Sequence, residues 1–252
     1  MSLAQTQNDI RAIARAARFD SEAAWTWRGE TMGPHRGRLN FPVPEGQPPI
    51  VAALAQQIYE GYYIRPDEVR LFPMSDRTAW LDGTRLLEAA NDTKRSWSPG
   101  WETRGEVDGR QILARGGDVI EAEPAHVKPH GGAFAVLLPG SVGGAQTGWF
   151  HARGEHEHPA ETPRSARIYW NVGRHGAGLL LHEITRALNA AKVPFHFKLL
   201  DDPPRYARAD AAVLYLGRDD VPRAAPVIRA VHARVLPYMK LQTPAFTKRM
   251  LS

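Results

Sequence analysis

The chain has 252 residues, of which 43% are apolar and 23% charged; its net charge is +5 and it contains no cysteine. This apolar fraction can bury a sizeable core, which excludes a disordered chain. The lack of cysteine excludes disulfides, thiolate nucleophiles and cysteine-ligated zinc. The longest strongly apolar stretch, near Ala133–Leu138, is far too short to cross a membrane. Because the N-terminus lacks an apolar signal segment, the sequence favours a cytoplasmic protein without a membrane partner.

The first part of the chain has the spacing of amphipathic helices. Asn8–Arg18, Pro49–Tyr63 and Asp82–Ala90 each place apolar residues on one face. A Gly/Pro-rich stretch, Gly29–Pro49, separates the first two and is expected to be a loop. The first 90 or so residues are therefore predicted to be mostly helical.

The middle of the chain changes character. Short runs compatible with strands occur at Arg110–Ala114 and Asp118–Glu121, after an Asp-Gly turn signal. His126–His130 can be extended, and the apolar run Ala133–Leu138 follows it. Pro139–Ser165 is rich in Gly, His and Pro, and it is predicted to be a long loop of the kind that often forms a functional lid.

The last third of the chain is predicted to be rich in strands. Arg167–Val172, Phe195–Leu200 and Ala211–Leu216 alternate or are continuously apolar. Between the first two lies an expected helix, Leu179–Ala191, and Pro222–Val235 is helix-like but is interrupted by a proline. The strand–helix–strand step from Arg167 to Leu200 could give a local parallel pair.

These elements predict an α+β fold with a mostly antiparallel sheet flanked by helices. We expect one domain over residues 1–252. Its residues 1–100 would form a mostly helical N-terminal part, and residues 121–252 the strand-rich part that carries function.

Basic residues gather in the C-terminal region, which holds nine basic and three acidic residues from Arg205 to Ser252. Such a region suits an anionic ligand, although a solvated, arginine-rich surface explains the same count. Lys128 and His130, two apart on an extended backbone, would point to the same side and pair an ammonium with an imidazole. Lys198 stands among phenylalanines, where lost solvation would lower its pKa. For each of these groups, an ordinary surface residue is the alternative.

Two further patterns carry weaker signals. Gly173–Gly178, before a helix, is similar to an anion-binding turn but has neither nucleotide-binding glycine pattern. Glu155–His158 alternates Glu and His without the spacing of a zinc site, so we expect no metal. Arg208 could grip a phosphate, or it could be an ordinary turn residue.

Taken together, the runs RIYWNV, FHFKLLDDPPRYARADAAVLYL and TPAFTKRM resemble the HopA-type effector family of plant-pathogenic bacteria. The same type of domain forms the lyase subunit of class V lanthipeptide synthetases. The resemblance covers about Ala125–Met250. The family is similar in turn to phosphothreonine lyases of the OspF/SpvC type. Three features are shared with those lyases. The Lys-x-His pair is Lys128 and His130, and the Phe-x-Phe-Lys strand contains Phe195, Phe197 and Lys198. The third feature is an arginine, Arg208, followed by a strand ending in Leu214 and Tyr215.

The resemblance implies a lyase-like domain that β-eliminates phosphate from phosphoserine or phosphothreonine. Lys198 would be the base, Lys128 would stabilise the enolate-like oxygen, and His130 would protonate the leaving phosphate. The residues expected to bind phosphate or the rest of the substrate are Arg208, Tyr215, Arg249, Arg167 and Asn171.

This chemistry needs no cofactor. Because the sequence has no kinase motifs, the implied partners are a phosphorylated precursor peptide and a separate Ser/Thr kinase. Three alternatives stay open: an effector that acts on host phosphoproteins, an inactive module that binds a phosphopeptide or leader peptide, and, less favoured, a nucleic-acid-binding protein. The absence of a stacking-platform pattern among the aromatic residues favours no nucleic-acid partner.

Overall fold

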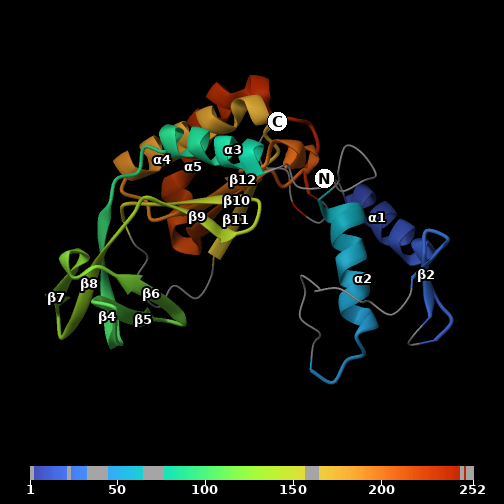
Figure 1. Ribbon diagram of the computed structural model, residues 1–252. Helices are drawn as coiled ribbons and strands as arrows, with labels where there is room; N and C mark the ends of the chain where they lie inside the picture. The colour runs from blue at the N-terminus through green and yellow to red at the C-terminus, as the bar shows by residue number, and fades with distance from the viewer. Residues whose placement is uncertain are drawn as a thin grey trace.

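The computed structural model describes residues 3–21, 24–32, 45–64, 77–156, 165–244 and 247. Its elements form an N-terminal group, a middle sheet and a larger layered body (Figure 1). All strand pairings between its named strands are antiparallel, so the predicted α+β fold with antiparallel sheets is confirmed.

The N-terminal group combines helices with a small sheet. It contains α1 (Leu3–Ala16), α2 (Ile50–Ile58) and a π-helical turn, η1 (Tyr59–Tyr63), that continues α2. Between α1 and α2 in the chain comes a small antiparallel sheet that was not predicted from the sequence. Its strands are β1 (Ala17–Phe19), β2 (Trp25–Trp27) and β3 (Glu30–Met32). Trp25 and Trp27 are buried, which explains why so short a sheet can persist.

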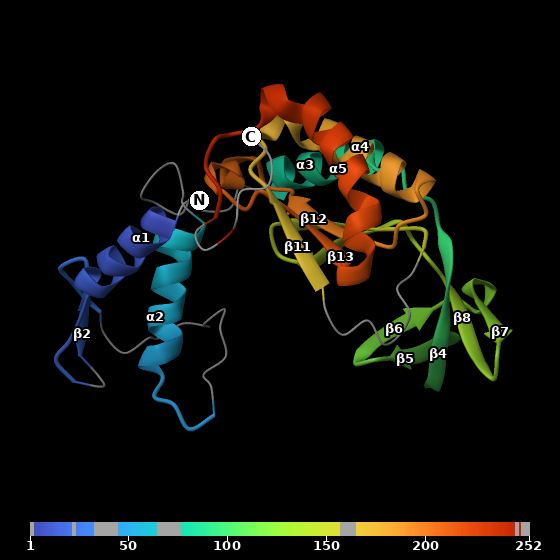
Figure 2. The same cartoon turned by 180° about the vertical axis from the view of Figure 1, so that it is seen from behind.

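The middle sheet has the order β6-β5-β4-β8-β7. Its strands are β4 (Ser96–Val107), β5 (Arg110–Arg115), β6 (Asp118–Ala122), β7 (Val127–His130) and β8 (Ala133–Leu138). A small apolar cluster around Trp101, Leu113 and Val136 holds it together. Strand β7 is an edge strand, and it lies at the outer end of this sheet in both views (Figures 1 and 2).

The layered body contains the main core. Its sheet has the order β11-β13-β12-β10-β9, so β12 is the central strand. The strands are β9 (Ser141–Gln146), β10 (Trp149–Arg153), β11 (Ser165–Trp170), β12 (His196–Leu200) and β13 (Ala212–Gly217). Helices α3 (Arg77–Ala90), α4 (Ala177–Ala190) and α5 (Val221–Val235) lie together on one side of it (Figures 1 and 2).

The side of the sheet that faces the helices follows from alternation. Phe197 and Leu199 of β12 and Leu214 of β13 are fully buried in the core cluster with Leu180 and Ile184 of α4. Residues between them on each strand therefore point away from the helices. At the start of α4, Gly176 lies so close to Tyr238 that a Cβ atom would overlap the tyrosine side chain.

Three sequence predictions about this body are wrong. Pro139–Ser165 is not one long loop, because it contains β9 and β10, joined by a two-residue turn at Thr147 and Gly148. The predicted parallel pair does not form, since β13 lies between β11 and β12 and pairs with both. Helix α5 runs through Pro226 from Val221 to Val235 rather than being interrupted there.

Candidate functional site

The face of the main sheet that points away from the helices carries a polar and aromatic array. Residues directly opposite each other on paired strands point to the same side. Two such rows cross the sheet: Tyr169, Val213, Lys198 and His151; and Arg167, Tyr215, His196 and Arg153. We call this surface the polar face. It brings together side chains from β10, β11, β12 and β13.

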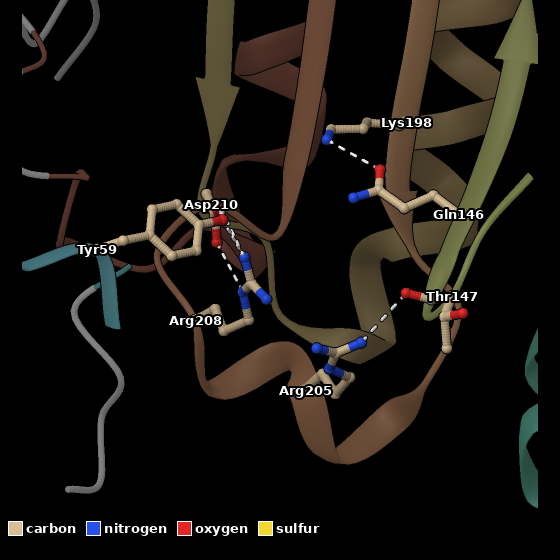
Figure 3. A network of polar contacts seen from close by, with 7 residues as sticks. All are labelled: Tyr59, Gln146, Thr147, Lys198, Arg205, Arg208 and Asp210. Carbon is tan, nitrogen blue, oxygen red and sulfur yellow. Dashed lines mark hydrogen bonds and ion pairs between the residues drawn. The ribbon is translucent and has the colours of Figure 1, made fainter. Parts of the chain in front are cut away.

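Lys198 lies at the centre of the polar face. Its Nζ atom is 4.3 Å from the centroid of the Trp149 ring and 5.9 Å from that of Tyr215, and it donates a 3.3 Å hydrogen bond to Gln146 Oε1 (Figure 3). Burial lowers the pKa of Lys198, and the positive charges of Arg208 and Arg167 lower it further, against the opposing effect of Asp210. Lys198 is therefore partly desolvated, as predicted, and its neutral form is more accessible than that of an exposed lysine.

His196 and His151 form a stacked pair beside Lys198. Their ring centroids are 5.0 Å apart, and His151 Nδ1 lies 2.9 Å from His196 Nε2. Burial lowers the pKa of His196 to about 4, with help from His151 and Lys198; burial and then Lys198 lower the pKa of His151. His151 Nε2 is buried and has no hydrogen-bond partner among the described residues. Such an orphan atom can mark a functional group.

The stack continues toward the edge of the sheet. The His196 ring stacks on Tyr215 with centroids 5.4 Å apart, and the Arg167 guanidinium lies 5.5 Å from the Tyr215 ring centroid. Arg167 and Tyr215, both predicted to contact substrate, thus share the polar face with Lys198. Arg167 is exposed, so its charge is accessible to an anion.

Arg208 is buried and already has a carboxylate partner. Its Nε donates to Asp210 Oδ1 and its Nη2 to Asp210 Oδ2, both at 2.9 Å, and Nη2 also donates to the Tyr59 hydroxyl at 2.7 Å (Figure 3). The planar fork that the sequence analysis assigned to phosphate therefore grips Asp210 in this structure. Asp210 was not among the predicted residues.

Arg205 is a second arginine at the same end of the site. It comes from the 3-10 turn Pro203–Ala207 and donates a 3.4 Å hydrogen bond to the Thr147 carbonyl in the β9–β10 turn. Partial burial lowers the pKa of Arg205, and the nearby charge of Arg208 lowers it further. Figure 3 shows Arg205, Arg208 and Lys198 around the same region. A phosphate bound beside Arg205 would relieve the repulsion between Arg205 and Arg208.

Lys128 and His130 are not brought to the polar face. Both are exposed on β7, in a different sheet from Lys198, and Lys128 Nζ lies 3.9 Å from the Trp97 ring centroid. In both views β7 and β12 are in different parts of the molecule (Figures 1 and 2). The expected assembly of Lys128, His130 and Lys198 in one site is therefore not what the structure shows.

The remaining predicted residues have other positions. Asn171 is buried just after β11, and its Nδ2 donates to the Gln242 carbonyl at 2.9 Å, which ties down the C-terminal segment. Arg249 lies outside the described residues. In the Glu155–His158 pattern, Glu155 accepts a hydrogen bond from the backbone of Lys94, and His158 lies outside the described residues.

Within the described part of the chain, no group of three or more His, Asp or Glu side chains could hold a metal ion. Over the same residues, no helix is both long enough and apolar enough to cross a membrane.

Four residues of the site were not predicted from the sequence: His151, His196, Arg205 and Tyr59. The alternation of Phe195–Leu200 already places His196 on the same side as Lys198, so His196 could have been found. His151 lies in the stretch that was predicted to be a loop. Tyr59 is distant in sequence and carries no local signal.

Comparison with known proteins supports the resemblance for part of the chain. Residues 144–252 match the HopA1 effector protein family. This C-terminal part is therefore similar to the HopA1 effector family, which is the family that the sequence resembled. The match includes the whole polar face but neither the Lys128–His130 pair nor the N-terminal group. No curated protein matches the chain.

Proposed function

We propose that the polar face binds a phosphorylated serine or threonine in a peptide and eliminates its phosphate, leaving dehydroalanine or dehydrobutyrine. The observation that carries this proposal is Lys198, whose pKa is lowered by burial on a surface that also presents Arg167 and Arg205. A neutral amine beside fixed positive charge suits removal of a proton next to a phosphate ester. The similarity of the HopA-type family to phosphothreonine lyases supports the same chemistry.

In the proposed reaction, neutral Lys198 takes the proton from Cα of the phosphorylated residue. The electron pair of that C–H bond forms the Cα=Cβ double bond, while the Cβ–O bond breaks and its electrons leave with the phosphate. Arg167 and Arg205 would hold the phosphate oxygens. Arg167 is exposed on the polar face, and Arg205 donates a 3.4 Å hydrogen bond to the Thr147 carbonyl, with Asp202 and Asp201 close enough to act on its charge.

The departing phosphate needs a proton, and the His151–His196 pair is the source we propose on the polar face. Both imidazoles favour the neutral form in the free protein. A phosphate dianion bound beside them would raise their pKa, because an opposite charge favours the protonated form. Lys128 and His130 take no part in this proposed step, since they lie on another sheet.

The proposed biological setting is lanthipeptide biosynthesis in the cytoplasm, with a separate kinase that phosphorylates the precursor peptide. An effector that acts on host phosphoproteins is the second candidate, and the match to the HopA1 effector family favours it. Both settings use the same elimination. They differ in the peptide that is bound, so a panel of phosphopeptides separates them.

The test is incubation of the full chain with a phosphothreonine peptide, followed by mass spectrometry for loss of phosphoric acid. We expect elimination by the wild type, no detectable product with Lys198→Ala, and full activity with Lys94→Ala, which removes an exposed lysine between α3 and β4. Phosphopeptide binding should survive in Lys198→Ala. Binding without elimination by the wild type would instead indicate an inactive phosphopeptide-binding module.

A further inference from the structure

The N-terminal group reaches the polar face through the π-helical turn η1. This turn lies outside the HopA1 match, which begins at residue 144. The backbone N–H of Ala209 donates a 2.6 Å hydrogen bond to the carbonyl of Ile64, directly after η1. Tyr59 and Tyr63, one turn apart in η1, stack with ring centroids 5.3 Å apart. π-Helical turns are rare and are often found at functional sites.

Tyr59 joins the ion pair beside Lys198. Its hydroxyl accepts a 2.7 Å hydrogen bond from Arg208 Nη2 and donates to Asp210 Oδ2 at 3.1 Å (Figure 3). Burial raises the pKa of Tyr59 to about 12, and the negative charge of Asp210 contributes to the increase. The hydroxyl therefore keeps its proton at neutral pH and can fill both roles at once.

Tyr63 contacts Arg167 indirectly, through Tyr169. Its ring meets that of Tyr169 edge to face, with centroids 5.9 Å apart and an angle of 83°. Interaction with Tyr169 raises the pKa of Arg167, and burial followed by Tyr169 raises the pKa of Tyr63. One turn of the N-terminal group thus contacts the groups that hold both Arg208 and Arg167.

We propose that Tyr59 and Tyr63 are positioning residues that hold Arg208, Asp210 and Arg167 in place around Lys198, so that η1 completes the site of the HopA1-type domain. This inference rests on the proposed lyase function. Asp210 is the key group, because its carboxylate must stay turned toward Arg208 and Tyr59. Without the Tyr59 hydroxyl, the carboxylate loses a donor and its negative charge acts more strongly on Lys198.

The consequence is a specific change in pH dependence. The charged or titratable groups around Lys198 are Asp210, Arg208, Arg167, His151, His196, Tyr215 and Tyr59. Among the groups that shift the pKa of Lys198, Asp210 raises it and the arginines lower it. A less restrained Asp210 would raise the pKa of the lysine, and the rising limb of the elimination rate would move to higher pH.

The test compares Tyr59→Phe and Tyr63→Phe with the matched control Tyr62→Phe. Tyr62 belongs to the same turn but packs against Trp27 and Arg28, away from the polar face. Affinity for a phosphothreonine peptide, elimination rate against pH, and thermal unfolding are measured on the full chain. We expect Tyr59→Phe to weaken phosphopeptide affinity by about tenfold, because a less restrained Asp210 carboxylate would repel the bound phosphate. It should also shift the rising limb upward, while Tyr62→Phe matches the wild type.

Several outcomes decide the matter. Equal affinity and pH profile in Tyr59→Phe, Tyr63→Phe and Tyr62→Phe would overturn the inference while leaving the lyase function intact. A wild type that binds the phosphopeptide without eliminating phosphate would remove the lyase function, and the affinities of the variants would still decide the role of η1. If the wild type does not bind the phosphopeptide, both proposals fall. If Tyr59→Phe is unstable, Tyr63→Phe must show weakened affinity through Arg167, or the inference is overturned.

Discussion

At the scale of single residues, burial lowers the pKa of the basic side chains on the polar face. Lys198 and His196 alternate with Phe197 and Leu199, so a strand that buries two apolar side chains also holds an amine and an imidazole at the rim of the core. The same alternation allowed Lys198 to be predicted from sequence. Its partners could not be, because Trp149, Asp210 and Tyr59 come from other segments of the chain.

The lowered pKa of Lys198 predicts the pH dependence of elimination. A base acts when it is unprotonated, so kcat/KM should rise with pH and level off near the pKa of Lys198 in the free protein. Because burial places that pKa below the ordinary 10.5, the plateau should begin at a lower pH than an exposed lysine would give. A rate profile on a phosphothreonine peptide measures this. A rising limb centred on 10.5 or above would show that Lys198 is not the base.

At the scale of elements, the largest difference between prediction and structure is the β9–β10 hairpin. The Gly, His and Pro content of the surrounding stretch, Pro139–Ser165, is typical of a loop, yet β10 pairs with the central strand β12 over its whole length. Thr147 and Gly148 form the turn, and such a Gly-containing two-residue turn between strands is a hairpin signal that could have been used. The prediction of a loop followed the Gly, His and Pro content of Pro139–Ser165 instead of this turn.

The same turn supports a prediction about Arg205. Gly148 has φ +79°, and a Cβ atom there would overlap Arg205 Nη1. Gly148→Ala should therefore move Arg205 and weaken phosphopeptide affinity by about tenfold, as expected for the loss of a charge-assisted hydrogen bond. Gly109→Ala is the control, because Gly109 has a similar φ of +77° with no atom near the new Cβ.

Both glycine variants should lose about 1 kcal/mol of stability from backbone strain, measured by chemical denaturation. Only Gly148→Ala should lose affinity, measured by titration with a phosphothreonine peptide. Equal affinities in the two variants would show that Arg205 does not contact the phosphate.

At the scale of the whole molecule, the residues that the sequence motifs predicted to form one site lie in two different sheets. The order Lys128–His130, then Lys198, then Arg208 agrees with the lyase pattern, but chain order does not report which sheet each strand enters. The predicted fold class follows from local patterns and is confirmed. The layout of three sheets depends on long-range pairing that local patterns do not contain.

This separation leads to a prediction that distinguishes the structure from the resemblance. His130 is exposed on the edge strand β7, whereas Lys198 lies on the central strand of the other sheet. From the structure, His130→Ala should eliminate phosphate within about twofold of the wild-type rate, since a general acid must lie within hydrogen-bond reach of the leaving oxygen. If His130 is the acid, the loss should be about 10²–10⁴-fold.

Single-turnover rates for His130→Ala and His196→Ala compare the two candidate acids directly, and thermal unfolding confirms that each variant is folded. A large loss in His130→Ala alone would mean that the middle sheet closes over the polar face when the peptide binds. A large loss in His196→Ala alone would place proton delivery on the polar face itself.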